Sequence, residues 1–322
     1  MTILVVRQLV IMAIIIFAGF IFAKILKVSS SDEKFLSKLL LYFINPCIII
    51  NSFNMEFDGT KLKQLVFVLI ISAVIHFVMI LISFVFTREK NEKLKSYSQI
   101  EKVGIVFTNC GFMGIPLIRG VFGNEGIFFL MGYLIIFNIF LWTYGYYQMS
   151  KSINLKKIVT NPNIIAVVIG LILFCTPLSI PKFLVTPISM VSECNTVIAM
   201  VLLGILFADF KLPSKSDSAV MDSKEYILRI IKFSFVRIVV CSVVNIILVF
   251  VIYKLFGNVE QIKMICFVVL ICSMCPAATS VPSLSCIFNK DSAYASVIVS
   301  LSSLLCMISI PSFVALAEML IK

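Results

Sequence analysis

Apolar stretches of about 20 residues recur along the whole chain and constrain its fold more than any other feature. A helix of that length crosses the hydrocarbon core of a bilayer, which is about 30 Å thick. Helices in lipid are apolar nearly all round, so little periodicity is expected inside such stretches. The alternating ten-residue strands of a membrane β-barrel are not visible. The sequence therefore predicts an all-α integral membrane protein.

Ten such stretches predict ten transmembrane helices. Their ranges are 4–26, 36–54, 64–86, 103–121, 127–149, 162–178, 186–208, 233–253, 264–288 and 293–317. The longest linkers, 87–102 and 209–232, contain lysines and are too short for a separate soluble domain. The first stretch lacks a convincing small-residue cleavage site, so we expect a retained first helix and not a signal peptide.

The charged residues lie mostly between the apolar stretches. They make up 13% of the chain, against 61% hydrophobic residues and a mean hydropathy of +1.10. A soluble domain with so little charge could not cover its surface with polar groups. The net charge of +11 would suggest nucleic acid in a soluble protein. Its placement between apolar stretches instead predicts a lipid bilayer as the partner, and no nucleic acid.

The distribution of basic residues predicts the orientation in the membrane. Of 27 Lys and Arg residues, 18 lie in or beside the odd-numbered loops, 8 lie on the other side, and Arg237 lies inside the eighth predicted helix. Cytoplasmic loops are the ones rich in Lys and Arg. We therefore expect the odd-numbered loops in the cytoplasm of a cell with this protein in its plasma membrane, and both termini outside.

Ten cysteines lie almost entirely inside the apolar stretches. Cys272 and Cys275 have the spacing of metal ligands, but the chain has a single histidine and no second cysteine pair. We predict packing roles for the cysteines, with no metal and no cofactor.

An internal repeat relates the fourth and ninth predicted helices. Residues 114–125 resemble residues 280–291 at a constant offset of 166. The aligned pairs are Pro116 with Pro282, Phe122 with Phe288, and Glu125 with Asp291. A repeat unit of five helices returns the chain to the opposite side, so the second copy must be inverted, as in many secondary transporters. The predicted units are 1–149 and 162–322, joined by a cytoplasmic linker at 150–161.

Clusters of helix-breaking residues lie in the middle of both related helices, at 108–116 and 275–282. Non-helical backbone at this depth is tolerated only inside the protein or against a water-filled cavity. We expect Pro116 and Pro282 each to begin a new half-helix, whose free N–H groups and dipole favour an anion. Asn109, Thr279 and Ser280 add neutral hydrogen-bonding groups. The alternative is that these residues only kink the helices or let them pack closely.

Other polar residues inside the predicted helices leave two interpretations each. Asn45, followed by proline, either borders the cavity or marks a simple kink. Glu193 and His76 are the candidates for ion coupling, because intramembrane ionisable groups are costly. Glu193 could equally reach the headgroups, and His76 could be a packing residue. Arg237 lies close enough to the cytoplasmic end to extend its guanidinium to the surface.

The segment 109–117, followed by Phe122-Gly-Asn-Glu-Gly126, resembles the auxin efflux carrier family, which includes plant PIN proteins and bacterial malate-permease-like members. The similarity extends to 162–165, to Leu203-Gly204 and to the prolines of the ninth helix. It covers essentially the whole chain, although the long loop found in many plant members between the fifth and sixth helices is missing.

The resemblance implies broken fourth and ninth helices that cross, within two inverted five-helix repeats. It also implies a scaffold from helices 1, 2, 6 and 7, a transport domain from helices 3–5 and 8–10, an elevator-type motion and a homodimer. A carboxylate would be held at the crossing. On this chain the implied site is Asn109, Gly111, Gly114, Pro116, Cys275, Pro276, Thr279, Ser280 and Pro282. Cys275 stands where a polar amide is expected in the repeat, which points to a different substrate.

These observations together predict a carrier of a small organic anion, such as malate or an auxin-like acid. One alternative is an anion channel. Another is a membrane-embedded enzyme, which would need a cluster of catalytic groups at one depth. The sequence leaves open the substrate, the direction of transport, the coupling ion and the oligomeric state.

Overall fold

The computed structural model describes residues 1–54, 57–151, 160–176, 178, 180–208 and 223–321. Within these residues every regular element is a helix, and one isolated antiparallel bridge joins Thr108 to Ala277. The prediction of an all-α protein is confirmed for this part of the chain. The predicted linker 150–161 and the predicted loop 209–232 lie partly outside it.

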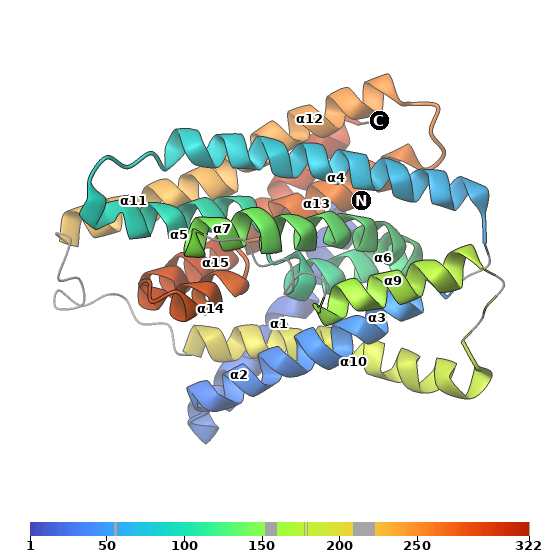
Figure 1. Cartoon of the computed structure of the whole chain (residues 1–322), viewed down its shortest axis with the longest axis horizontal. Coiled ribbons are helices and arrows are strands. Elements are labelled where there is room, and N and C mark those ends of the chain that lie inside the picture. The colour runs from blue at the N-terminus through green and yellow to red at the C-terminus, as the bar shows by residue number, and fades with distance from the viewer. Residues whose placement is uncertain (55–56, 152–159, 177, 179, 209–222, 322) are drawn as a thin grey trace.

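The helices run roughly side by side along one direction (Figure 1). The first half contains α1 (Thr2–Leu26), α2 (Ser30–Leu39), α3 (Asn45–Ser52), α4 (Gly59–Phe86), α5 (Lys95–Val106), α6 (Ile115–Phe140) and α7 (Tyr146–Ser150). The second half contains α9 (Pro162–Cys175), α10 (Lys182–Ala208), α11 (Ser223–Phe235), α12 (Cys241–Leu255), α13 (Ile262–Met274), α14 (Ser280–Ile287) and α15 (Ser292–Leu320). Single π-helical turns join successive helices at Leu40–Ile44, Leu141–Gly145 and Val236–Val240, and another at Cys110–Gly114 leads directly into α6.

Seven helices or continuous helical runs among the described residues are long and apolar enough to cross a membrane. Two shorter apolar helices, α9 and α13, fall in the predicted sixth and ninth spans. From residue 110 onward, the predicted fourth and fifth spans fall in one helical run from Cys110 to Ser150, which is divided at Gly123 by non-helical angles (φ 64°, ψ −153°), between the two predicted ranges. The predicted loops 87–102 and 209–232 were also too long, since α5 begins at Lys95 and α11 at Ser223.

Short polar side chains fix where several helices begin. The Ser29 hydroxyl accepts from the backbone of Asp32, whose carboxylate accepts in return from Ser29, which forms a capping box before α2. Asp58 and Asp291 cap α4 and α15 in the same way, each accepting from a backbone N–H in the first turn. Asn161 caps α9, whose first residue is a proline without an N–H to satisfy. These caps explain why the polar linkers end where they do.

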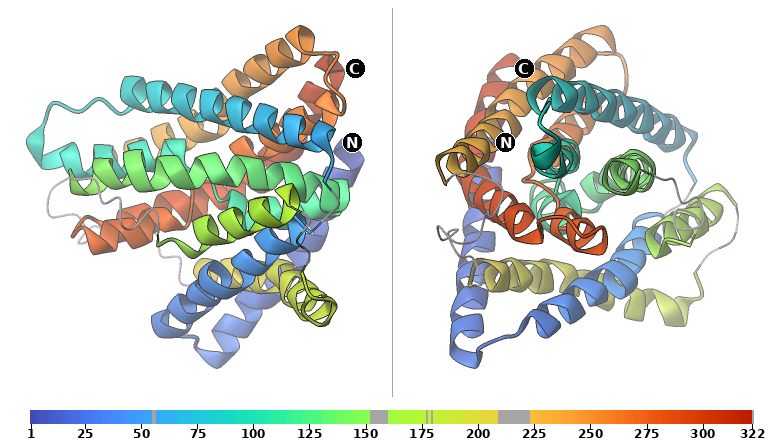
Figure 2. Two further views of the ribbon diagram at one scale, coloured as in Figure 1. Left: turned by 45° about the vertical axis from the view of Figure 1, so that its right-hand side comes forward. Right: turned by 60° about the vertical axis from the view of Figure 1, so that its left-hand side comes forward.

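The helices pack in two groups. In the first group α1 runs along α10, α10 contacts α3, and α3 contacts α9. Helices α4–α6 form the second group with α11–α15. In Figures 1 and 2 the first group, with α2, lies on the lower side and the second on the upper side. Contacts of α1 with α6 and α15, and of α3 with α6, join the groups.

Two glycines let α1 and α10 approach closely. A Cβ atom at Gly204 would lie 2.2 Å from the carbonyl oxygen of Ile16, and one at Gly19 would lie 2.8 Å from the backbone of Val201. Neither position has room for a side chain. The backbones therefore meet through small residues, as is typical of helix pairs in membranes.

The offset of 166 found in the sequence also relates backbone features. Gly123 kinks the α6 run with φ of 64°, and Asn289, which is 166 residues later, has φ of 52° between α14 and α15. Helix α5 begins at Lys95 and α13 at Ile262, so the helices that precede the breaks correspond within one residue. The two segments thus share a fold pattern and not only a sequence pattern.

Candidate functional site

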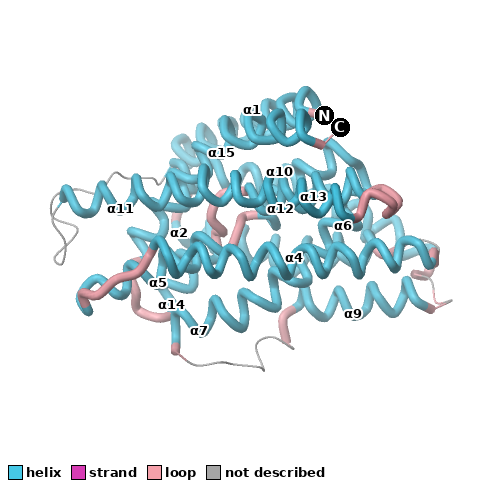
Figure 3. The backbone as a smooth tube through the Cα atoms, turned by 90° about the horizontal axis from the view of Figure 1, so that it is seen from above, coloured by secondary structure: helices cyan, strands magenta, loops and turns pink. Residues whose placement is uncertain are grey.

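Two interrupted helices meet in the interior of the protein. Helix α5 ends at Val106 and the next helical turn begins at Cys110, while α13 ends at Met274 and α14 begins at Ser280. The two non-helical segments pair in antiparallel fashion. The backbone N–H of Asn109 donates to the Pro276 carbonyl at 2.7 Å, and that of Ala278 donates to the Phe107 carbonyl at 2.9 Å. Figure 3 shows loop segments midway along the helices as well as at their ends.

Pro276 accounts for one interruption. A residue before proline is disfavoured in the helical region, and Cys275 accordingly has φ of −54° and ψ of 154°. Pro276 also has no N–H to continue the helix. Phe107 is extended as well, with φ of −100° and ψ of 127°. The backbone groups released at the two breaks satisfy one another, which removes the cost of leaving them unpaired in an apolar interior.

The expectation that Pro116 and Pro282 begin the new half-helices is wrong. The half-helices begin earlier, at Cys110 and Ser280, so Pro282 is the third residue of its helix and Pro116 follows a full π-helical turn. Pro282 is tolerated because N–H groups of the first turn have no acceptor within the helix. The positions of the breaks follow instead from Pro276 and from the antiparallel pairing.

A cavity of about 300 Å³ opens beside the paired segments. It is bounded by α2 and α3, by both half-helix starts, and by parts of α6, α9 and α15. Among the described residues that line it, Glu33 alone carries a charge. The neutral polar lining among the described residues is Ser37, Asn45, Thr108, Asn109, Asn138, Asn161, Asn163, Thr279, Ser280, Ser283, Ser296 and Ser300, with the aromatic Tyr42 and Trp142. An apolar cavity with a limited set of polar groups is typical of a small-molecule site.

Six of the ten predicted site residues line this cavity. They are Asn45, Asn109, Gly111, Thr279, Ser280 and Pro282. Gly114, Pro116, Cys275 and Pro276 do not line it. Gly114 instead packs against Cys275, because a Cβ at Gly114 would lie 3.6 Å from the Cys275 sulfur. These four residues lie behind the cavity wall.

Asn45 both borders the cavity and lies in a continuous helix. A π-helical turn precedes it, so the following proline distorts the helix without ending it. Its Oδ1 accepts from Nδ2 of Asn195 on α10 at 3.1 Å. A Cβ at Gly111 would lie 4.0 Å from Asn45 Nδ2. The amide is therefore held near the start of the half-helix at Cys110.

Five buried polar atoms on residues that line the cavity lack a partner within the described part of the chain: Oγ1 of Thr108, Nδ2 of Asn109, Nε1 of Trp142, Oδ1 of Asn163 and Oγ of Ser280. Asn109 and Ser280 lie at the starts of the two half-helices, and both of their atoms can donate. Buried polar groups in proteins nearly always have a hydrogen-bond partner, so these donors point to a ligand or water. The N–H groups of the first turns beginning at Cys110 and Ser280 have no acceptor within their helices. Donors therefore converge on one side of the cavity.

A family model described as a membrane transport protein matches residues 4–154 and 147–314. The chain belongs to this family. The match confirms the resemblance to auxin efflux carriers that was drawn from the sequence. A comparison with curated proteins gave no match. As a member of a transporter family, this multi-pass membrane protein has a substrate and a bilayer as its partners.

Arg237 of this transporter lies against the other ends of the broken helices. Its side chain is 1% exposed, so the expected extension to the membrane surface is wrong. The guanidinium donates to the carbonyl oxygens of Ser273 at 2.7 Å, Ile105 at 3.4 Å and Cys275. These carbonyls belong to the C-terminal ends of α13 and α5, where a positive charge is favourable. Hydropathy could not predict this, because the acceptors are distant in sequence.

The two candidates for ion coupling lie away from the cavity lining. His76 is fully buried, with Nδ1 at 2.7 Å from the Ser72 carbonyl and aromatic rings around it. A carbonyl only accepts, so Nδ1 carries a proton. Glu193 is exposed on α10 and accepts a weak hydrogen bond from Ser189 at 3.5 Å. The geometry places neither beside the unpartnered donors.

Several cavity residues were not singled out from the sequence. Asn138 and Asn163 contribute amides, and Glu33 contributes the one charge of the described lining. Asn138 could have been predicted, because it is an amide inside the predicted fifth helix. Asn163 and Glu33 lie at helix starts, where polar residues are ordinary, so the sequence alone does not distinguish them.

Proposed function

We propose that this transporter is a carrier of a small organic anion that binds through a carboxylate in the cavity beside the two broken helices. The unpartnered donors Asn109 Nδ2 and Ser280 Oγ carry this proposal. They lie with the first turns of both half-helices, whose N–H groups favour negative charge. A carboxylate accepts from several donors at once and would satisfy both atoms.

Positive charge at the broken helices favours an anion over a cation, against a single opposing charge in the described lining. Glu33, on α2, is the one carboxylate in the described lining. Arg237 adds a full positive charge behind the paired segments. The half-helix N-termini add partial positive charge on the cavity side. A short mono- or dicarboxylate, such as malate or an auxin-like acid, has the chemistry that this arrangement favours.

We extend the proposal to ten membrane spans in two inverted repeats, with crossing interrupted helices in spans four and nine. The antiparallel bridge at Thr108 and Ala277 supports the crossing. The positive φ angles of Gly123 and Asn289 support the repeat. The N-terminal amine lies 2.8 Å from the Glu318 carboxylate, which supports the two ends sharing one side. Both ends would face outside the plasma membrane, by the distribution of basic residues.

An elevator-type motion accounts for the two packing groups. The group of α1, α3, α9 and α10 would act as the scaffold, dimerising with a second copy, and the other group would carry the substrate. The cavity is lined by both groups, so relative movement would expose it to each side in turn. Sequence units 1–149 and 162–322 would each supply helices to both groups.

Reconstituted flux tests the proposal. Proteoliposomes containing the purified protein should take up radiolabelled malate, another short carboxylate or an indole acid, and uptake should saturate. Asn109→Ala should raise the half-saturating concentration roughly 10- to 100-fold, because a hydrogen bond to a charged group contributes about 1.5–3 kcal/mol.

Asn124→Ala is the matched control, since Asn124 is exposed at the turn after α6's first half and does not line the cavity. Equal kinetics for both variants would remove Asn109 from the site. Flux that fails to saturate and far exceeds carrier turnover would indicate an anion channel instead. Repeating uptake with pH and sodium gradients identifies the coupling ion.

A further inference from the structure

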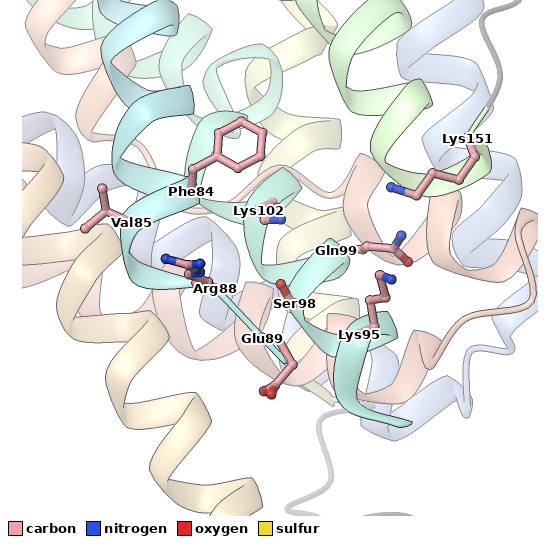
Figure 4. A pocket seen from close by; sticks show the side chains of 9 residues that line it. All are labelled: Phe84, Val85, Arg88, Glu89, Lys95, Ser98, Gln99, Lys102 and Lys151. Atoms are coloured by element: carbon pink, nitrogen blue, oxygen red, sulfur yellow. The ribbon is translucent and has the colours of Figure 1, made fainter. Parts of the chain in front are cut away.

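A second cavity, separate from the proposed substrate site, has a strongly basic lining. Its volume is about 540 Å³, and it lies between the end of α4, the start of α5 and the end of α7. Figure 4 shows the lining side chains, with Lys95, Gln99 and Lys151 on one side of the end of α4 and Val85 and Arg88 extending to the other. They are Phe84, Val85, Arg88, Glu89, Lys95, Ser98, Gln99, Lys102 and Lys151. No residue of this set lines the cavity at the broken helices.

The positive charges of this basic cavity are poorly balanced. The one carboxylate in its described lining, Glu89, is already bonded to Arg229 at 2.7 Å. Lys95 forms an ion pair with Glu92, and both side chains of this pair are exposed. None of the ion pairs found among the described residues includes Arg88, Lys102 or Lys151.

A neighbouring lysine responds to the positive charge of this cavity. Burial and the nearby charge of Lys151 lower the pKa of the Lys290 amine, which lies in the loop after α14. Lys290 donates to the Gln99 side-chain oxygen. The NH2 group of Gln99 is then left to donate in the cavity. The cavity therefore offers several cations and neutral donors to an anion.

An apolar wall adjoins these cations. Phe84 is 45% exposed and Val85 is 72% exposed, and both belong to the outer face of α4 with Phe77 and Leu81. This face is apolar over several turns and has the character of a lipid-facing surface. The Lys102 amine lies 4.8 Å from the centre of the Phe84 ring, so the basic and apolar parts of the wall are continuous. A purely water-soluble anion would leave the apolar part uncovered.

We propose that this cavity binds the phosphate headgroup of an anionic phospholipid, with an acyl chain along Phe84 and Val85. The phosphate would be held by Arg88, Lys102 and Lys151, and would relieve their mutual repulsion. Basic pockets between membrane helices are suited to such headgroups. The lysine-rich side is the predicted cytoplasmic side, where anionic lipids are concentrated.

Binding of soluble short-chain lipids to the purified full-length protein tests the proposal. Dioctanoyl phosphatidic acid should bind and raise the melting temperature, while dioctanoyl phosphatidylcholine should not. Removing two charges with Arg88→Gln/Lys102→Gln should weaken binding roughly 30-fold, because each basic residue near an anionic surface contributes about 1 kcal/mol. The matched control is Lys34→Gln/Lys38→Gln on α2, which removes the same number of positive charges from two exposed positions. It should weaken binding by less than about threefold.

Equal losses in the two double variants would show attraction to diffuse surface charge and would overturn the site. Glycerol 3-phosphate binding as tightly as the lipid would show a site for free phosphate compounds and would overturn the lipid assignment. If the double variant does not fold, cross-linking of the wild-type protein decides. A phosphatidic acid with a diazirine in its acyl chain should label peptides containing Phe84 and Val85. Labelling elsewhere would overturn the proposal.

Discussion

Arg237 shows how one side chain can hold two interrupted helices together. Burying a charge costs several kcal/mol unless hydrogen bonds and opposite charge compensate. Here the compensation comes from backbone carbonyls at two helix ends and not from an acid. The planar guanidinium donates in several directions, which a lysine ammonium on a flexible stem cannot reproduce. Arg237 therefore stabilises the interrupted helices both through hydrogen bonds to their backbone carbonyls and through its positive charge at their C-terminal ends.

Substitution of Arg237 separates these effects. Arg237→Met should leave the Ser273 and Cys275 carbonyls without a donor and lower the free energy of unfolding by about 2–5 kcal/mol. Arg237→Lys should recover part of the loss, because lysine keeps the positive charge but lacks the planar set of N–H donors of the guanidinium. Thermal melting in detergent measures both. Unchanged melting of the methionine variant would contradict a structural role, and equal loss in both variants would place the whole effect in hydrogen-bond geometry.

The sequence predicted part of the site at this scale. Asn109, Thr279 and Ser280 were predicted from their residue types beside helix breakers, and they line the cavity. The role of Arg237 was not predictable, because position along a helix does not define which face it presents. The lining residues from α2 and α9 also depend on tertiary packing, which a single sequence does not reveal.

At the scale of elements, the contact between α1 and α10 depends on glycine residues, which have no side chain to keep the two backbones apart. Gly204 brings its backbone within van der Waals distance of the α1 backbone near Ile16. Backbone atoms cannot move aside as the end of a flexible side chain can. The two helices would have to separate to accommodate even one methyl group at position 204.

Gly204→Ala should therefore lower stability, by about 1–3 kcal/mol for overpacking of a close contact. Gly59→Ala is the control, since a Cβ at Gly59 would meet no atom within 4 Å. The melting temperatures of both variants in one detergent provide the comparison. A Gly204→Ala variant as stable as Gly59→Ala would mean that α1 and α10 are not tightly packed in the membrane.

The sequence located the interrupted helices but not their first residues. Clusters at 108–116 and 275–282 correctly marked the regions of the breaks. The prolines within them suggested starts at Pro116 and Pro282, whereas helices resume at Cys110 and Ser280. Local helix propensity carries no information about the antiparallel pairing between the two segments. Because of that pairing, each half-helix resumes before the proline that the sequence suggested as its start.

At the scale of the whole molecule, an ion network joins three distant parts of the chain. Arg229 on α11 forms a bidentate pair with Glu101 on α5 at 2.9 and 3.1 Å. It also donates to Glu89, in the loop after α4, at 2.7 Å. Tyr294 on α15 donates to Glu101 at 2.6 Å. Such networks are stronger than isolated surface pairs.

The network predicts a pH dependence of stability. Hydrogen bonding to Arg229 lowers the pKa of the Glu89 carboxyl from its ordinary value of 4.5. A carboxyl with a lowered pKa stabilises the fold above its ordinary pKa, and the stabilisation is lost as the pH falls through the folded-state pKa. The melting temperature of wild type should exceed that of Glu89→Gln most at neutral pH, and the difference should shrink below about pH 4.5.

Glu92→Gln is the control for this measurement, because Glu92 belongs to an exposed pair with Lys95. It should have little effect at any pH. A difference between wild type and Glu89→Gln that stays constant from pH 7 to pH 4 would show that the Glu89 carboxylate does not stabilise the folded state through its charge.

The pairing of the two interrupted helices has a consequence for how such a protein can diversify. Both hydrogen bonds of the pairing use main-chain atoms, from Asn109 to Pro276 and from Ala278 to Phe107. Replacing the side chain at position 109 leaves its N–H donor in place. Mutation can therefore alter the chemistry presented to the cavity while the main-chain pairing is kept. Selection for a new cargo and selection for correct folding then act on different atoms of the same residues.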